Sequence, residues 1–107
     1  MKKILLIYLF VLLPTVCTAQ TGLFKAFGPT NSSCAKYVNE VTTDEQAKQI
    51  YSWWVMGFMT GINYVKLRSP ATDIEAHDAW LLKYCQEHPL DTFIYAAIKL
   101  NEEIERK

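Results

Sequence analysis

The stretch YSWWVMGFMTGINYV, residues 51–65, decides the fold of this chain. It belongs to an uncharged run of sixteen residues, 50–65, which is shorter than the roughly twenty apolar residues that a membrane-spanning helix needs. Ser52, Thr60 and Asn63 also place polar groups within the run. The run therefore predicts the long helix of a small folded domain and not a membrane anchor.

The two faces of this helix have different predicted roles. One face is the predicted buried stripe, formed by Ala47, Ile50, Trp54, Gly57, Phe58, Gly61 and Val65. Gly57 and Gly61 are predicted close-packing positions, because glycine costs about 1 kcal/mol inside a helix and two of them need a packing reason. The other face carries a candidate partner-binding surface, formed by Trp53, Met56, Thr60 and Asn63. The alternative is that neighbouring helices cover this second face.

The N-terminus, MKKILLIYLFVLLPTVCTAQ, has the layout of a secretory signal peptide. Two lysines precede ten apolar residues (4–13), which are too few to form a stable membrane span. Cys17 and Ala19 are small residues at positions suited to cleavage after about Ala19. Acylation of Cys17 is the alternative, but the residues before it match a lipoprotein site poorly. We expect export to the periplasm and a mature chain of residues 20–107.

Removing residues 1–19 changes the charge and the cysteine count. Nine Lys/Arg and eleven Asp/Glu remain, a net charge of −2, so the chain has no basic footprint for nucleic acid. Two cysteines remain, Cys34 and Cys85, and an even pair in a short exported chain predicts one disulfide. This bond would close a loop of about 50 residues. In the chain-entropy account, such a loop contributes roughly 4 kcal/mol to stability.

Local signals divide the mature chain into a leader and one helical domain. Residues 20–31 hold two glycines and a proline without helical periodicity, which predicts a flexible leader. Residues 32–107 contain helical patterns and no alternating strand pattern. The predicted fold class is all-α: a single small four-helix domain stapled by one disulfide.

Capping residues and prolines predict where the helices begin. The four starts are a serine cap at Ser32 or Ser33, the capping boxes Thr42–Glu45 and Thr72–Glu75, and Pro89 at a first helical position. The second and third helices then cover about 43–67 and 73–87. The last helix has a predicted buried stripe with alternating spacings of three and four: Leu90, Phe93, Ala97, Leu100 and Ile104.

One constellation of the sequence could carry chemistry. His77, Cys85 and His88 share a face of the third helix, and a thiolate with two imidazoles can bind zinc or form a nucleophile with its base. His77 and Asp78 diverge by about 100° on a helix and cannot form a dyad. The sequence has no phosphate-binding loop, serine elbow or His-Glu-x-x-His motif. We therefore predict no enzymatic activity, cofactor or metal, with a zinc or thiol enzyme as the alternative.

Several motifs together resemble a group of small exported bacterial proteins. CAKY, then WVMGFMTGINY, then WLLKYCQEHPLDTF resemble the patterns W-V-x-G-F-x-x-G-x-N and Y-C-x-x-N-P-L-D of that group. The resemblance covers about residues 33–104, and His88 stands where the group usually has asparagine. In layout the chain is also similar to the HdeA/HdeB type of periplasmic acid-stress chaperone and, more loosely, to Tai-like immunity proteins of type VI secretion.

The resemblance implies a function in protein binding. The HdeA-like comparison implies an acid-stress holdase, with the Cys34–Cys85 disulfide joining an early and a late helix and clients bound on exposed apolar surface. The Tai-like comparison implies an immunity protein that neutralises one secreted toxin. The leading hypothesis is a non-enzymatic periplasmic protein-binding factor whose partner is a protein client or a toxin, and a homodimer stays open.

Overall fold

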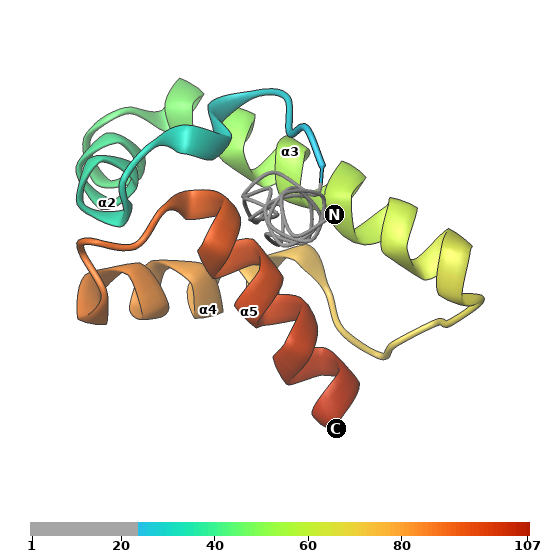
Figure 1. Ribbon diagram of the computed structural model, residues 1–107. Coiled ribbons are helices and arrows are strands. Elements are labelled where there is room, and N and C mark those ends of the chain that lie inside the picture. Colours follow the sequence, from blue (N-terminus) through green and yellow to red (C-terminus); the bar gives the residue numbers. More distant parts are fainter. Residues whose placement is uncertain (1–23) are drawn as a thin grey trace, which may run out of the picture.

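Four α-helices and one short 3-10 turn form the part of the chain that the computed structural model describes, residues 24–107 (Figure 1). The elements are η1 (Pro29–Asn31), α2 (Cys34–Thr43), α3 (Glu45–Lys66), α4 (Ile74–Glu87) and α5 (Phe93–Arg106). No strand occurs within residues 24–107, which confirms the predicted all-α fold of four helices. The predicted signal peptide, its cleavage site and residues 20–23 of the leader lie outside the described residues.

An aromatic cluster and a disulfide form the centre of the core. The rings of Tyr37, Tyr51 and Phe93, from three different helices, pack with centroids 4.7 to 4.9 Å apart. Cys34 and Cys85 are joined by a disulfide and are fully buried, with Cα atoms 4.7 Å apart. The predicted disulfide is therefore confirmed, and it ties the start of α2 to the end of α4.

The helix starts are partly as predicted. Ser33 caps α2, because its Oγ accepts a hydrogen bond from the Lys36 amide at 3.1 Å. The caps of α3 and α4 are Asp44 and Asp73, each of which accepts an amide hydrogen from the first turn. The two predicted threonine capping boxes are wrong, because the caps lie nearer to the helices: Asp44 is two residues after Thr42, and Asp73 is one residue after Thr72.

Each of these threonines has another partner. Thr42 lies in the last turns of α2, where its hydroxyl donates to the carbonyl of Val38 at 2.6 Å. Thr72 lies in the loop before α4, with its Oγ1 2.9 Å from Nε2 of His77. Such local side-chain bonds compete with capping in the same short residues.

The last helix begins at Phe93 and not at Pro89. The carbonyls of Pro89 and Asp91 accept the Ala35 and Cys34 amides of the α2 N-terminus at 3.1 and 2.6 Å. Residues 88–92 are therefore a turn that satisfies the free amides of another helix. Leu90, predicted to be buried, is 96% exposed in this turn. The rest of the predicted stripe is correct, with three buried residues and one half-buried residue: Phe93, Ala97, Leu100 and Ile104.

The buried stripe of α3 is rotated by about one residue from the predicted one. Tyr51, Val55 and Met59 are buried. Trp54, Phe58 and Ile62 flank them, half-buried. Ile50 and Val65, which were predicted to be buried, are 48% and 79% exposed. The helix is apolar on almost every side, so apolarity alone does not determine which side is buried. Its rotation about its axis is determined by Tyr51, whose ring packs against those of Tyr37 and Phe93.

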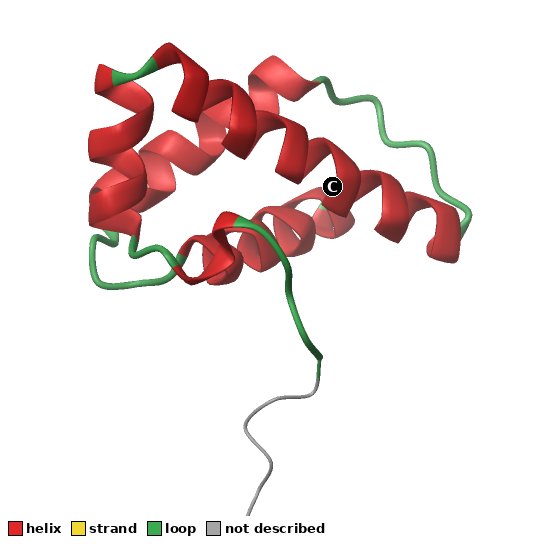
Figure 2. Ribbon diagram, turned by 90° about the horizontal axis from the view of Figure 1, so that it is seen from above, coloured by secondary structure: helices red, strands yellow, loops and turns green. Residues whose placement is uncertain are grey.

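The ordered part of the leader begins earlier than predicted. Thr30, within η1, is 1% exposed, and Ser32 accepts a hydrogen bond from the Phe93 amide at 2.8 Å. Gly28 has a positive φ of 91°, and a Cβ there would lie 2.7 Å from the Trp54 ring, so a larger residue does not fit. Figure 2 shows the chain before η1 as an extended loop that leaves the helices.

Candidate functional site

The solvent side of α3 is an exposed and uncharged surface. We call it the outer face, and it consists of Ile50, Trp53, Met56, Gly57, Thr60, Gly61, Tyr64 and Val65. Trp53 is 64% exposed and Tyr64 is 80% exposed, and no other described helix covers them. Figure 1 shows α3 extending beyond α2 before the loop 67–73 returns to α4. Three of the four predicted partner-binding residues therefore lie on an open surface: Trp53, Met56 and Thr60.

The two glycines of α3 lie on the outer face and do not pack against another helix. Apart from its chain neighbours and the backbone of its own helical turn, a Cβ at Gly57 or at Gly61 would meet no atom of residues 24–107 within 4 Å. The predicted close-packing role is wrong, because it depended on the other rotation of the helix. The glycines instead lower the surface along α3, in a shallow groove that continues to Ile62 and Val65.

A second shallow groove joins the first at Gly57 and Phe58. It lies between the leader and α3, and its walls are Phe24, Lys25, Ala26, Phe27, Trp53, Trp54, Gly57, Phe58 and Ile94. The Trp54 indole N–H donates to the carbonyl of Phe27, which holds the leader against the helix. Phe24 and Phe27 are both mostly exposed. Sequence reasoning missed them because it treated the leader as flexible, although two phenylalanines so close together were a readable signal.

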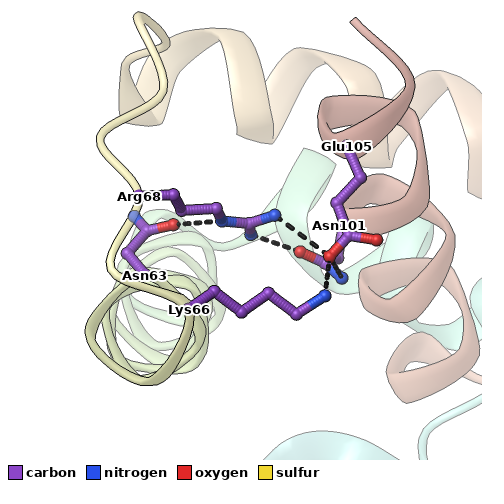
Figure 3. Close-up of polar contacts among 5 residues, drawn as sticks. All are labelled: Asn63, Lys66, Arg68, Asn101 and Glu105. Carbon is purple, nitrogen blue, oxygen red and sulfur yellow. Dashed lines mark hydrogen bonds and ion pairs between the residues drawn. The ribbon is translucent and has the colours of Figure 1, made fainter.

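The fourth predicted residue, Asn63, belongs to a polar cluster that joins α3 to α5 (Figure 3). Its Oδ1 accepts from Nε of Arg68 at 2.7 Å, and Arg68 also donates to Asn101. Glu105 accepts from Arg68 Nη1 at 3.3 Å and from the Lys66 ammonium. We call these five residues the clamp. Asn63 is therefore committed to an internal contact and is not free for a partner.

The clamp depends on an unusual backbone conformation at the end of α3. Leu67 has a left-handed φ of 50°, which is rare for a branched residue. This turn brings the chain back over the helix, so that the Arg68 amide donates to the Asn63 carbonyl at 3.1 Å. Sequence reasoning missed the clamp, because Arg68 and Glu105 are 37 residues apart and only the fold brings them together.

Three titratable groups near the clamp and α4 have shifted pKa values. The hydrogen bond from the Lys66 ammonium holds the pKa of Glu105 below its usual value of 4.5. Burial lowers the pKa of His77 below 6.5, and burial raises the pKa of Asp78 above 3.8. A fall in pH therefore affects these three groups in different ways.

The residues of the alternative zinc or thiol site do not come together. Cys85 is in the disulfide, so its sulfur is neither a thiolate ligand nor a nucleophile. His77 is buried beside Thr72, whereas the His88 ring stacks on Tyr84 with centroids 4.1 Å apart. Within residues 24–107, no group of three or more His, Cys, Asp or Glu is placed to hold a metal ion.

Comparison with protein-family models, with curated proteins and with solved structures gives no match to this chain. The resemblance to exported helical proteins therefore stays an expectation from the motifs. Among the helices of residues 24–107, none combines the length and the apolarity needed to cross a bilayer.

Proposed function

We propose that this protein is an exported, non-enzymatic protein-binding factor, and that its binding surface is the outer face with the groove beside the leader. The observation that supports this proposal is the exposure of Trp53, Tyr64 and Val65 on one uncharged helix face. Folded chains rarely leave a contiguous apolar surface of this kind unless it meets a partner. Tryptophan, tyrosine and methionine are also the residues enriched at protein interfaces.

The chemistry of the outer face favours a holdase as the specific form of this function. The surface is shallow, carries no charged residue between Lys48 and Lys66, and includes the adaptable side chain of Met56. Specific recognition of one toxin would call for charge complementarity in at least part of the interface. An uncharged apolar surface suits exposed apolar segments of many unfolded chains.

The clamp supplies a physical reason for activity in acid. Because the folded pKa of Glu105 is lowered, its contribution to stability is present above its unfolded pKa of 4.5 and is lost as the pH falls through the folded value. His77 also has a lowered folded pKa, so its contribution is present above 6.5 and is lost as the pH falls further. Asp78 acts in the opposite direction, because its raised pKa favours the folded chain when it is protonated.

Loss of the clamp would enlarge the apolar surface. Glu105 is the acceptor that Lys66 and Arg68 share between α3 and α5. Once it is protonated, the end of α3 can separate from α5, and the partly covered side chains of Ile62 and Ile104 become available. Acid would thus extend the outer face toward the core side of α3.

The test is the aggregation of an unrelated client protein, followed by light scattering at pH 7 and at about pH 2.5. We expect this protein to suppress scattering at the acid pH and to lose much of that effect in the Trp53→Ser/Met56→Ser variant. Leu90→Ser is the matched control, because Leu90 is also apolar and is even more exposed, at 96%, but lies far from α3 in the chain. Scattering that is unchanged by the protein at both pH values would remove the holdase and leave an immunity protein with one specific partner.

A further inference from the structure

A cavity of about 460 Å³ lies where α2, α3 and α4 meet, on the core side of α3 and apart from the outer face. Most of its wall is apolar, and its lining residues include Val41, Val55, Ile74, Ala79 and Leu82. Six residues with polar side-chain groups also line it: Tyr37, Lys48, Tyr51, Ser52, Glu75 and Asp78. An apolar cavity with a few converging polar groups is the usual form of a small-molecule site.

Tyr37 contributes a hydroxyl that opens on the cavity and makes no hydrogen bond to residues 24–107. The residue is 4% exposed, and its ring is fixed between those of Tyr51 and Phe93. The hydroxyl makes no hydrogen bond within residues 24–107. Every fully enclosed side-chain oxygen of these residues has a hydrogen-bond partner. The Tyr37 oxygen is therefore not fully enclosed, and it is reached through the cavity. The oxygen can therefore bond to a molecule that enters the cavity.

Asp78 contributes a carboxylate that is only partly satisfied. Its Oδ2 accepts one hydrogen bond, from Ser52 Oγ at 2.8 Å. Lys48 lies near enough to act on it through space but forms no ion pair with it. Glu75 also lines the cavity, so the charged lining residues carry one net negative charge. The cavity is thus built for a cation with an apolar body.

We infer that this cavity binds an organic ammonium group, which donates hydrogen bonds to the Asp78 carboxylate and to the Tyr37 hydroxyl oxygen. The apolar body of the ligand lies against Val41, Val55 and Leu82. The ammonium can come from a free alkylamine or from a lysine side chain of a protein, and both present the same chemistry. This site does not depend on the holdase proposal, because it lies away from the outer face.

Charged groups around Asp78 set the pH range of binding. The groups that face it are Tyr37 from α2, Lys48 from α3, and Glu75 and His77 from its own helix. Burial and the nearby carboxylate raise the pKa of Tyr37, so its hydroxyl stays protonated. Binding needs the ionised carboxylate and is therefore lost as the pH falls through the raised pKa of Asp78.

The experiment measures binding of hexylammonium at pH 7 by calorimetry and by amide chemical shifts around Ser52 and Leu82. We expect millimolar affinity, and no binding of the neutral isostere 1-hexanol at the same concentrations. Asp78→Asn should weaken binding at least about tenfold, because it removes the charge-assisted bond. Glu87→Gln is the matched control, an exposed carboxylate of the same helix outside the cavity, and should bind as the wild type does.

Two further variants separate recognition from folding. Tyr37→Phe keeps the packed ring and should weaken binding about threefold without lowering the melting temperature, because the hydroxyl has no partner to lose. Lys48→Met removes a like charge from the cavity and should strengthen binding. Equal hexylammonium affinity in the wild type and Asp78→Asn, or equal binding of 1-hexanol, would overturn the inference.

Two lysine derivatives identify the source of the ammonium. The first, called the blocked lysine, has a blocked backbone amine and carboxyl group and a free side-chain ammonium, and the second also has an acetylated side chain. If the blocked lysine binds and the acetylated form does not, a protein side chain fits the site as well as a free amine. If hexylammonium alone binds, the ligand is a free amine. If neither hexylammonium nor the blocked lysine binds, the site is not an ammonium site.

Discussion

At the scale of single residues, glycine has two opposite roles in this chain. Gly28 combines a positive φ with the Trp54 ring against its α-carbon, so only glycine fits there. Gly57 and Gly61 have helical backbones and open space where a Cβ would be. The free energy that these glycines cost the helix is therefore not offset by packing against residues 24–107. A helix face without side chains at these two positions is consistent with close approach of a partner.

Substitution of the exposed glycine should stabilise the protein. Gly61→Ala removes backbone freedom from the unfolded chain and meets no neighbour, so we expect about 1 kcal/mol of added stability and a melting temperature several degrees higher. Thermal unfolding followed by circular dichroism measures this. Gly28→Ala, the control, should lower the melting temperature. A lower melting temperature for Gly61→Ala would contradict the open position of this glycine.

At the scale of elements, the two ends of α3 are held in different ways, and the contacts of the clamp hold its C-terminal end. Its first half packs against α2 and α4 through Tyr51 and Val55, whereas its last turns join α5 through side chains. Polar contacts at an exposed end open more readily than a packed core. The clamp therefore determines whether the end of α3 stays in contact with α5 at a given pH.

Removal of the shared carboxylate should open this end at neutral pH. Glu105→Gln leaves Lys66 and Arg68 without their common anion, and we expect faster amide exchange over residues 60–66 with little change in global melting temperature. Glu102→Gln is the matched control, because Glu102 has Lys99 of the same helix as its one ion-pair partner among residues 24–107. Unchanged exchange in Glu105→Gln would show that the clamp does not hold α3.

The elements also mark the limit of what the sequence predicts. The number of helices and the disulfide follow from periodicity and an even cysteine pair, because these signals are local or depend only on counting, whereas three of the four predicted helix starts were wrong. The side on which α3 is buried does not follow, since Trp53, Trp54 and Tyr51 offer three apolar directions. The clamp, the turn at Pro89 and the cavity at Asp78 all depend on contacts between distant segments, and no local pattern encodes them.

At the scale of the whole molecule, the domain is small, and one disulfide bond joins helices α2 and α4. The Cys34–Cys85 bond lies next to the aromatic cluster and connects residues 51 positions apart. A domain of this size has little apolar core in reserve, so a constraint on the unfolded chain is a large part of its stability.

Loss of the disulfide should lower stability strongly. The Cys34→Ala/Cys85→Ala variant should lose roughly 4 kcal/mol, enough to leave the domain partly unfolded at physiological temperature. Urea unfolding with and without reductant, with free thiols counted by mass spectrometry, gives the comparison. A fully reduced protein with the same unfolding midpoint as the oxidised one would contradict this expectation.

The most direct measurement of the central claim is site-specific crosslinking from the outer face to an unfolded client. A photoreactive residue in place of Trp53 reports contact at the outer face, and the same residue in place of Leu90 reports contact at an exposed apolar position elsewhere. At about pH 2.5 we expect client adducts from position 53 and few from position 90, with fewer from either at pH 7. Equal adduct yields from the two positions, or a higher yield from position 90, would contradict the assignment of the binding surface to α3.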